Sequence, residues 1–131
     1  MLFKGDYDRR KFYSLMGHFF AEKKYKKLMP YLSNDDDMVW NVEVKKGSAI
    51  GFISYSEKTS NIHIGYCYSE ENKALESDLV VNLLNEFPNK NFNIELEKTF
   101  DKDIYLNLGF GIYKETTNYW YLEKKVQHEN L

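Results

Sequence analysis

The sequence predicts an α/β domain with a mixed, mostly antiparallel sheet of six or seven strands, one parallel crossover pair and flanking helices. Apolar residues first recur at helical spacing and then alternate through three consecutive runs, as in an antiparallel meander. A helical segment separates the third run from a fourth, which is the order of a parallel crossover. A short helix follows the fourth run, and two more strands then complete the sheet.

The composition indicates one ordered domain over residues 1–131. A chain of this length with 43% hydrophobic content can bury a core without disulfides or metal. The net charge of -2 supplies no bulk field for nucleic acid or an anionic membrane, so we expect neither as a partner. The single cysteine, Cys67, forms no internal bridge, and we find no apolar run of membrane-spanning length and no signal-peptide pattern. We therefore expect a cytoplasmic protein without a metal.

The first helix should begin near Arg9, where Asp8 can cap it. A short strand in the preceding LFKGD is the uncertain member of the sheet. The helical spacing runs through Phe12, Leu15, Met16, Phe19, Phe20, Tyr25, Leu28, Met29 and Leu32. One bent helix and two short helices explain this pattern equally well.

Three strands are expected between residues 38 and 69. MVWNVEV and AIGFISYS flank the turn KKGS as a hairpin, and IHIGYCYS extends the meander. Plain alternation in this third strand puts one set of side chains on one face, namely Ile62, Ile64, Tyr66 and Tyr68. The opposite face then carries His63, Gly65 and Cys67.

The second half of the chain predicts the crossover and the last hairpin. ALESDLVVNLLNEF has helical spacing and stops before Pro88, and NFNIELEKT alternates as a strand. DKDIYLNLGF predicts a short helix with Gly109 near its end. GIYKE and NYWYLEKKV form the final two strands.

This order of elements, with its Tyr-x-x-x-Gly-Phe segment, resembles the GNAT superfamily of acyl-CoA-dependent N-acyltransferases over nearly the whole chain. The tail motif of that family is matched by Ile104, Tyr105, Leu108, Gly109 and Phe110. GFISYS also looks like the second meander strand of the family. The resemblance implies that the parallel strands splay apart and that the acyl thioester lies between them.

The resemblance also implies how the chemistry proceeds. A deprotonated amine attacks the thioester carbonyl, a strand amide holds the oxyanion and a tyrosine protonates the leaving thiolate. By position this tyrosine is Tyr105, whose phenol has an unperturbed pKa of roughly 10; a ring that only packs against the sheet is an equally good interpretation. His63 and Glu43 are candidate bases, against the plainer interpretations of a satisfied strand histidine and a solvent-exposed glutamate.

Acetyl-CoA is the cofactor that the resemblance implies, with contacts from Tyr66, Cys67, Tyr68, Lys73, Ala74 and Leu75. In the family a loop of the form Arg/Gln-x-x-Gly-x-Gly/Ala clasps the pyrophosphate at a helix N-terminus. Here the corresponding residues are Glu71, Ala74 and Glu76. Because one like charge about 5 Å from a phosphate costs roughly 3 kcal/mol at an effective dielectric constant near 20, we expect this end of the coenzyme to be held weakly.

Two functions are consistent with these observations. The first is a divergent N-acetyltransferase that holds acetyl-CoA mainly by its pantetheine arm and acts on an unidentified amine. The second is a protein that kept the fold, lost coenzyme binding and binds a protein or another small ligand. A homodimer through the aromatic last strands, around Trp120, is a further hypothesis.

Overall fold

The computed structural model describes residues 1–70 and 73–126. One sheet of seven strands has the order β1-β2-β3-β4-β5-β7-β6. The strands are β1 (Leu2–Phe3), β2 (Met38–Lys45), β3 (Ser48–Glu57), β4 (Asn61–Ser69), β5 (Asn91–Glu97), β6 (Gly111–Glu115) and β7 (Tyr119–Lys124). Strands β4 and β5 pair in parallel, whereas the other neighbours in the described sheet are antiparallel. The predicted fold class is confirmed, including the short first strand.

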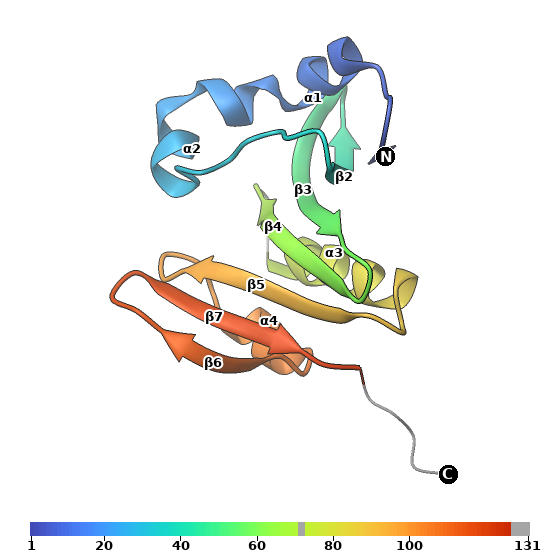
Figure 1. Ribbon diagram of the computed structural model, residues 1–131. Helices are drawn as coiled ribbons and strands as arrows, with labels where there is room; N and C mark the ends of the chain where they lie inside the picture. The colour runs from blue at the N-terminus through green and yellow to red at the C-terminus, as the bar shows by residue number, and fades with distance from the viewer. Residues whose placement is uncertain (71–72, 127–131) are drawn as a thin grey trace.

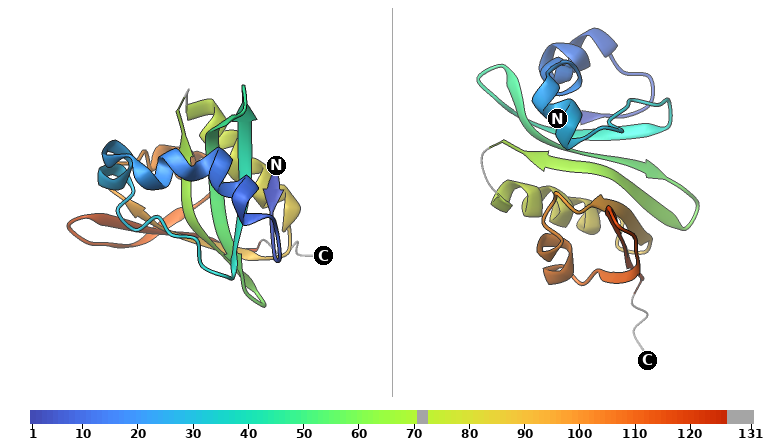
Figure 2. Two further views of the ribbon diagram at one scale, coloured as in Figure 1. Left: turned by 90° about the horizontal axis from the view of Figure 1, so that it is seen from above. Right: turned by 90° about the vertical axis from the view of Figure 1, so that its left-hand side faces the viewer.

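Helices cover both faces of the sheet (Figures 1 and 2). On one face lie α1 (Arg9–Ala21) and α2 (Lys23–Leu28), and on the other lie α3 (Lys73–Glu86) and α4 (Asp103–Asn107). The Asp8 carboxylate caps α1 by accepting from the Lys11 N–H at 3.1 Å. Glu22 then adopts an extended conformation between α1 and α2, so the N-terminal segment is two short helices.

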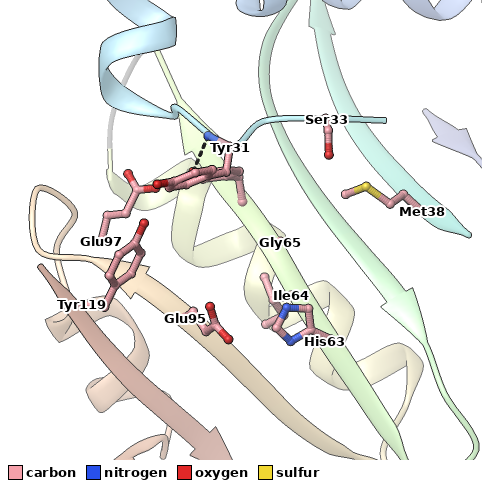
Figure 3. A pocket seen from close by; sticks show the side chains of 10 residues that line it. Tyr31, Ser33, Met38, His63, Ile64, Gly65, Glu95, Glu97 and Tyr119 are labelled. Atoms are coloured by element: carbon pink, nitrogen blue, oxygen red, sulfur yellow. Dashed lines mark hydrogen bonds between the residues drawn. The ribbon is translucent and has the colours of Figure 1, made fainter. Parts of the chain in front are cut away.

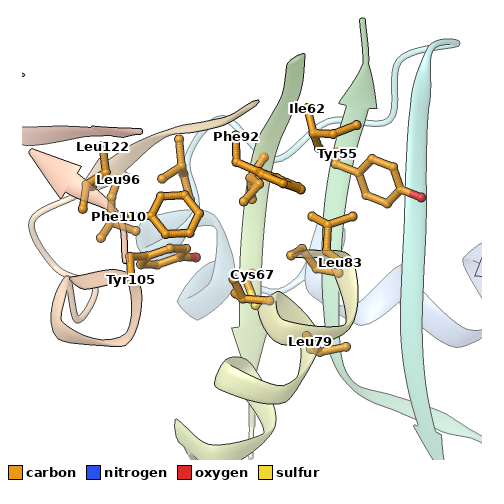
Figure 4. Close-up of a cluster of buried hydrophobic side chains, with 14 of the residues drawn as sticks. Tyr55, Ile62, Cys67, Leu79, Leu83, Phe92, Leu96, Tyr105, Phe110 and Leu122 are labelled. Carbon is orange, nitrogen blue, oxygen red and sulfur yellow. The ribbon is translucent and has the colours of Figure 1, made fainter. Parts of the chain in front are cut away.

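Each face of the sheet has its own core. Beneath α1 the core is aromatic, with Phe12 against Trp40 at a ring-centroid distance of 5.2 Å and Phe19 against Phe52 at 5.1 Å. Beneath α3 and α4 it is mainly aliphatic (Figure 4). Phe100, in the loop after β5, packs against both cores. The two cores therefore approach each other at this loop.

A β-bulge interrupts β4. Gly65 and Tyr66 together oppose Ser54 of β3, and the Tyr66 N–H donates to the Ser54 Oγ at 3.0 Å. A Cβ added to Gly65 would lie 2.6 Å from that same oxygen. Glycine is therefore the residue that lets the bulged backbone approach Ser54 closely.

The bulge makes the predicted alternation of β4 wrong beyond Ile64. We expected Tyr66 and Tyr68 to share the face of Ile64, with Cys67 opposite. Instead Cys67 shares the α3 face with Ile64, while Tyr66 and Tyr68 turn to the α1 face, which His63 also occupies. One extra residue in the strand thus changes which side chains can act together.

The edge strand β6 is exposed along its whole length, including Ile112 and Tyr113. The homodimer through the last strands stays a prediction.

In the part of the chain that the structure describes, no helix is long and apolar enough to cross a membrane.

We expect Gly65→Ala to lower the free energy of unfolding by about 2 kcal/mol, because its methyl group overpacks the bulge. Urea titration measures the change. A matched control is Gly17→Ala in α1, where an added Cβ meets nothing within 4 Å and should leave stability unchanged or raised. In a Ser54→Ala background the cost of Gly65→Ala should shrink, since the clashing oxygen is gone. Equal costs in both backgrounds would contradict the proposed clash.

Candidate functional site

The parallel strands β4 and β5 separate partway along their length. Their pairing ends at Ile64 opposite Ile94, although β4 continues to Ser69 and β5 to Glu97. Beyond this point the facing backbone edges of the two strands do not pair with each other. The crevice that the sequence implies is therefore present in the sheet.

The protein's own side chains close this crevice. Tyr66 crosses from β4 to β5, and its hydroxyl donates to the Glu97 Oε1 at 2.5 Å. The Phe100 ring lies 6.1 Å from that of Tyr66, centroid to centroid. Farther out, the Lys73 Nζ at the start of α3 pairs with the Asp101 Oδ2 at 2.6 Å. An incoming ligand would have to displace these contacts.

A cavity of about 400 Å³ opens beside the crevice on the face of α1 and α2 (Figure 3). Glu95 and Glu97 line it from β5, His63 from β4, and Tyr119 from β7. Within residues 1–70 and 73–126, neither carboxylate forms an ion pair. Burial raises the pKa of Glu97, although the hydrogen bond from Tyr66 acts in the opposite direction. Two carboxylates without an ion-pair partner among the described residues make this cavity favourable for cations.

His63 lies in this cavity with a fixed partner. Its Nδ1 is 2.5 Å from the Oδ1 of Asn93, an atom that can only accept a hydrogen bond. In this arrangement Nδ1 carries the proton and Nε2 of the neutral ring is the acceptor. His63 can accept a proton at Nε2.

Tyr105 lies on the opposite face of the sheet, in the core beside Cys67 (Figure 4). Burial raises the pKa of Tyr105 well above its ordinary value, so its phenol stays protonated at neutral pH. Burial likewise raises the pKa of Cys67, whose thiol donates to the Glu76 carbonyl at 3.5 Å. Cys67 is therefore a neutral core thiol and is not activated as a nucleophile.

Glu76 lies at the end of the crevice where the resemblance places the coenzyme phosphates. Its Oε1 accepts from the Ser69 N–H at 3.3 Å. Burial raises the pKa of Glu76, and the nearby Asp101 acts in the same direction, so the carboxylate is held in an unfavourable environment. Ala74 is exposed, and Glu71 lies outside the described residues. The protein thus places a carboxylate of its own on a backbone donor at this end.

The other predicted residues lie at varied distances from the crevice. Glu43 is exposed on β2, and β3 separates that strand from β4, so the structure does not bring Glu43 to the site. The Tyr68 ring packs 5.7 Å from that of Phe19 and also lines a second cavity of about 400 Å³ with Lys73. Leu75 packs against the core beneath α3.

The sequence reasoning missed Glu95 and Glu97. A signal for them was present, because NFNIELEKT alternates apolar residues with Asn93 and these two glutamates. Two carboxylates on one face of a strand that borders the implied crevice are a readable feature. Among the described residues, no group of three or more His, Cys, Asp or Glu side chains is arranged to hold a metal ion.

No protein-family model matches the sequence, and no curated protein sequence matches it closely. Solved structures do match it. An acyl-CoA N-acyltransferase from Pseudomonas aeruginosa superposes with a TM-score of 0.75 at 13% identity, over 95% of this chain and 97% of that one. Escherichia coli ElaA gives 0.69 at 15% identity, over 92% and 93%. The Campylobacter jejuni N-acetyltransferase PseH in complex with acetyl coenzyme A gives 0.59 at 13% identity, over 97% and 100%. The chain has the fold of the GNAT acyl-CoA N-acyltransferases.

Proposed function

We propose that the protein is a GNAT-type N-acyltransferase that transfers an acyl group from acyl-CoA to an amine held in the acidic cavity. One observation carries this proposal. The crevice between β4 and β5 has a cavity lined by Glu95 and Glu97 on one face of the sheet. On the other face, Tyr105 lies in the core close to Cys67 of β4. Acyl transfer from a thioester to an amine needs a proton acceptor near the amine and a proton donor near the leaving thiolate. Candidate groups for both roles lie on the two faces of this crevice.

The residues fit the acyl-pantetheine arm of the coenzyme. Beyond Ile64 and Ile94 the facing edges of β4 and β5 are not paired with each other, so they offer backbone groups to an amide-bearing chain. The side chains of Tyr66 and Phe100 occupy the space between these strands, so both must change conformation when the pantetheine arm binds. The phosphate end does not fit, because Glu76 already accepts from the Ser69 N–H.

When bound, the coenzyme supplies an activated thioester. The carboxylates of Glu95 and Glu97 attract the ammonium form of the amine, and His63 Nε2 or the Glu97 carboxylate accepts the proton that the amine loses. The raised pKa of Glu97 brings this carboxylate closer to the range useful for a base near neutral pH. Tyr105 holds its phenolic proton on the far side of the crevice, where the leaving thiolate needs it.

Replacing Tyr105 tests its role as the acid. Tyr105→Phe keeps the ring contact with Phe110 and removes the phenolic proton. We expect kcat for acetyl transfer to simple primary amines to fall about 100-fold, with the Kd of acetyl-CoA little changed. Thiol release measures the rate. The matched control is Tyr113→Phe on β6, whose exposed phenol should be dispensable. Unchanged turnover in Tyr105→Phe would make Tyr105 a packing residue only.

Removing the charge of Glu76 should strengthen coenzyme binding. Glu76→Gln keeps an acceptor for the Ser69 N–H and removes a like charge beside the phosphates, so we expect acetyl-CoA to bind about tenfold tighter. Asp78→Asn, an exposed acid on the same helix, is the control for net charge.

The pH dependence gives the Glu76 experiment a second readout. Because the pKa of Glu76 is raised, its carboxyl gains a proton early as the pH falls, and its repulsion of the phosphates disappears. The advantage of Glu76→Gln over the parent should therefore shrink as the pH falls below neutral, before an ordinary glutamate would titrate. Calorimetry measures the Kd of acetyl-CoA for the parent and for Glu76→Gln at each pH. Equal Kd values at neutral pH would contradict the proposed position of the phosphates beside Glu76.

The closed crevice favours a second candidate function, a protein that has lost coenzyme binding and uses the acidic cavity to bind a cationic partner. Calorimetric titration with acetyl-CoA separates the two. Submillimolar binding that strengthens in Glu76→Gln is the result expected for a transferase. No binding heat at millimolar acetyl-CoA, in the parent and in Glu76→Gln alike, is the result expected for a protein that has lost coenzyme binding.

A further inference from the structure

We infer that the amine acceptor is a short linear diamine carrying two positive charges, held by Glu95 and Glu97. This inference rests on the proposed function for the reaction, but the binding of the diamine can be tested without it.

The first argument is the spacing of the two carboxylates. Glu95 and Glu97 stand two positions apart on β5, so their Cα atoms are about 7 Å apart and their side chains leave the same face of the sheet. Both side chains lie in the cavity wall (Figure 3). A monoamine can neutralise one of these carboxylates, whereas a linear diamine with a chain of four or so carbons, such as 1,4-diaminobutane, can reach both.

The second argument is the absence of an internal counter-charge. The nearest lysine in the sequence, Lys98, directs its Nζ to the Glu115 carboxylate at 2.8 Å and over the Trp120 ring. The cavity lining itself contains no lysine or arginine among the described residues. Two carboxylates on the wall of one cavity attract a dication and disfavour an anion. An acceptor that carries a carboxylate of its own is therefore disfavoured.

The third argument is the aromatic wall. Tyr31, Tyr66 and Tyr119 line the same cavity, and Met38 adds apolar surface. Tyrosine rings attract ammonium groups through their faces and also cover the methylene groups between two nitrogens. A cavity of about 400 Å³ suits a small molecule of this kind.

The arrangement also indicates which nitrogen reacts. Glu97 accepts from Tyr66, the residue that crosses the crevice, so an ammonium at Glu97 lies beside the crevice. Glu95 is exposed and lies closer to the point where the strands still pair. Glu95 therefore anchors the nitrogen that is not acylated, and it is a specificity-determining residue and not a catalytic one.

Calorimetric titration of the protein with 1,4-diaminobutane and with butylamine tests the assignment. We expect the diamine to bind about tenfold tighter than butylamine, and we expect Glu95→Gln to remove most of this preference. Glu43→Gln removes an exposed glutamate of β2 and should keep the preference, which controls for net charge. Equal binding of the two amines, or a preference that survives in Glu95→Gln, would overturn the inference.

An acetyl transfer assay with the same two amines separates this inference from the proposed function. Faster transfer to the diamine, with the preference lost in Glu95→Gln, supports both. Preferential binding of the diamine without transfer to either amine overturns the transferase and keeps the ligand. Equally fast transfer to butylamine and to the diamine overturns the diamine and keeps the transferase.

Discussion

The hydrogen bond from the Tyr66 N–H to the Ser54 hydroxyl holds the bulge on which the candidate site depends. A bulge adds a residue to one strand and increases its twist. Pairing between β4 and β5 ends at Ile64, directly before the bulge, so the strands part where the register of β4 changes. The same extra residue turns Tyr66 to the face of the acidic cavity and leaves Cys67 in the core beside Tyr105.

A half-buried carboxylate lies at each end of the crevice. Glu97 at the cavity and Glu76 at the outer end both have raised pKa values, with burial as the main cause. Negative charge at the cavity attracts an amine, whereas negative charge at the outer end opposes coenzyme phosphates. For the proposed transferase, the crevice is thus better matched to an amine acceptor than to the coenzyme, and we expect backbone groups of the separated strands to supply most of the contacts to the coenzyme.

Much of the fold could be predicted from the sequence because hydrophobic periodicity and Pro, Gly and Asp signals mark its elements. The choice between one bent helix and two depended on the conformation of Glu22, which periodicity does not report. We assigned Tyr66 and Cys67 to the wrong faces of the sheet, because strict alternation assumes a period of two residues along the strand. A bulge shifts this period, and it can be recognised only from the pairing with the neighbouring strand. Tyr105 and His63 could be named as candidates from the sequence and stay predictions, while the position of Glu43 two strands away from β5's partner β4 follows only from the strand order. Glu95 and Glu97 were readable from alternation once their strand was known to border the crevice.

The central claim is that the space between β4 and β5 is where an acyl-CoA ligand binds. A ¹H–¹⁵N correlation spectrum recorded during titration with acetyl-CoA tests it directly, because it reports each backbone amide separately. The account predicts that the amides of Tyr66, Cys67 and Glu97 shift together with that of Phe100, as the contacts that close the crevice give way, while the amides of β2 stay in place. Shifts that are absent, or that gather on β2 and α1, would contradict the account.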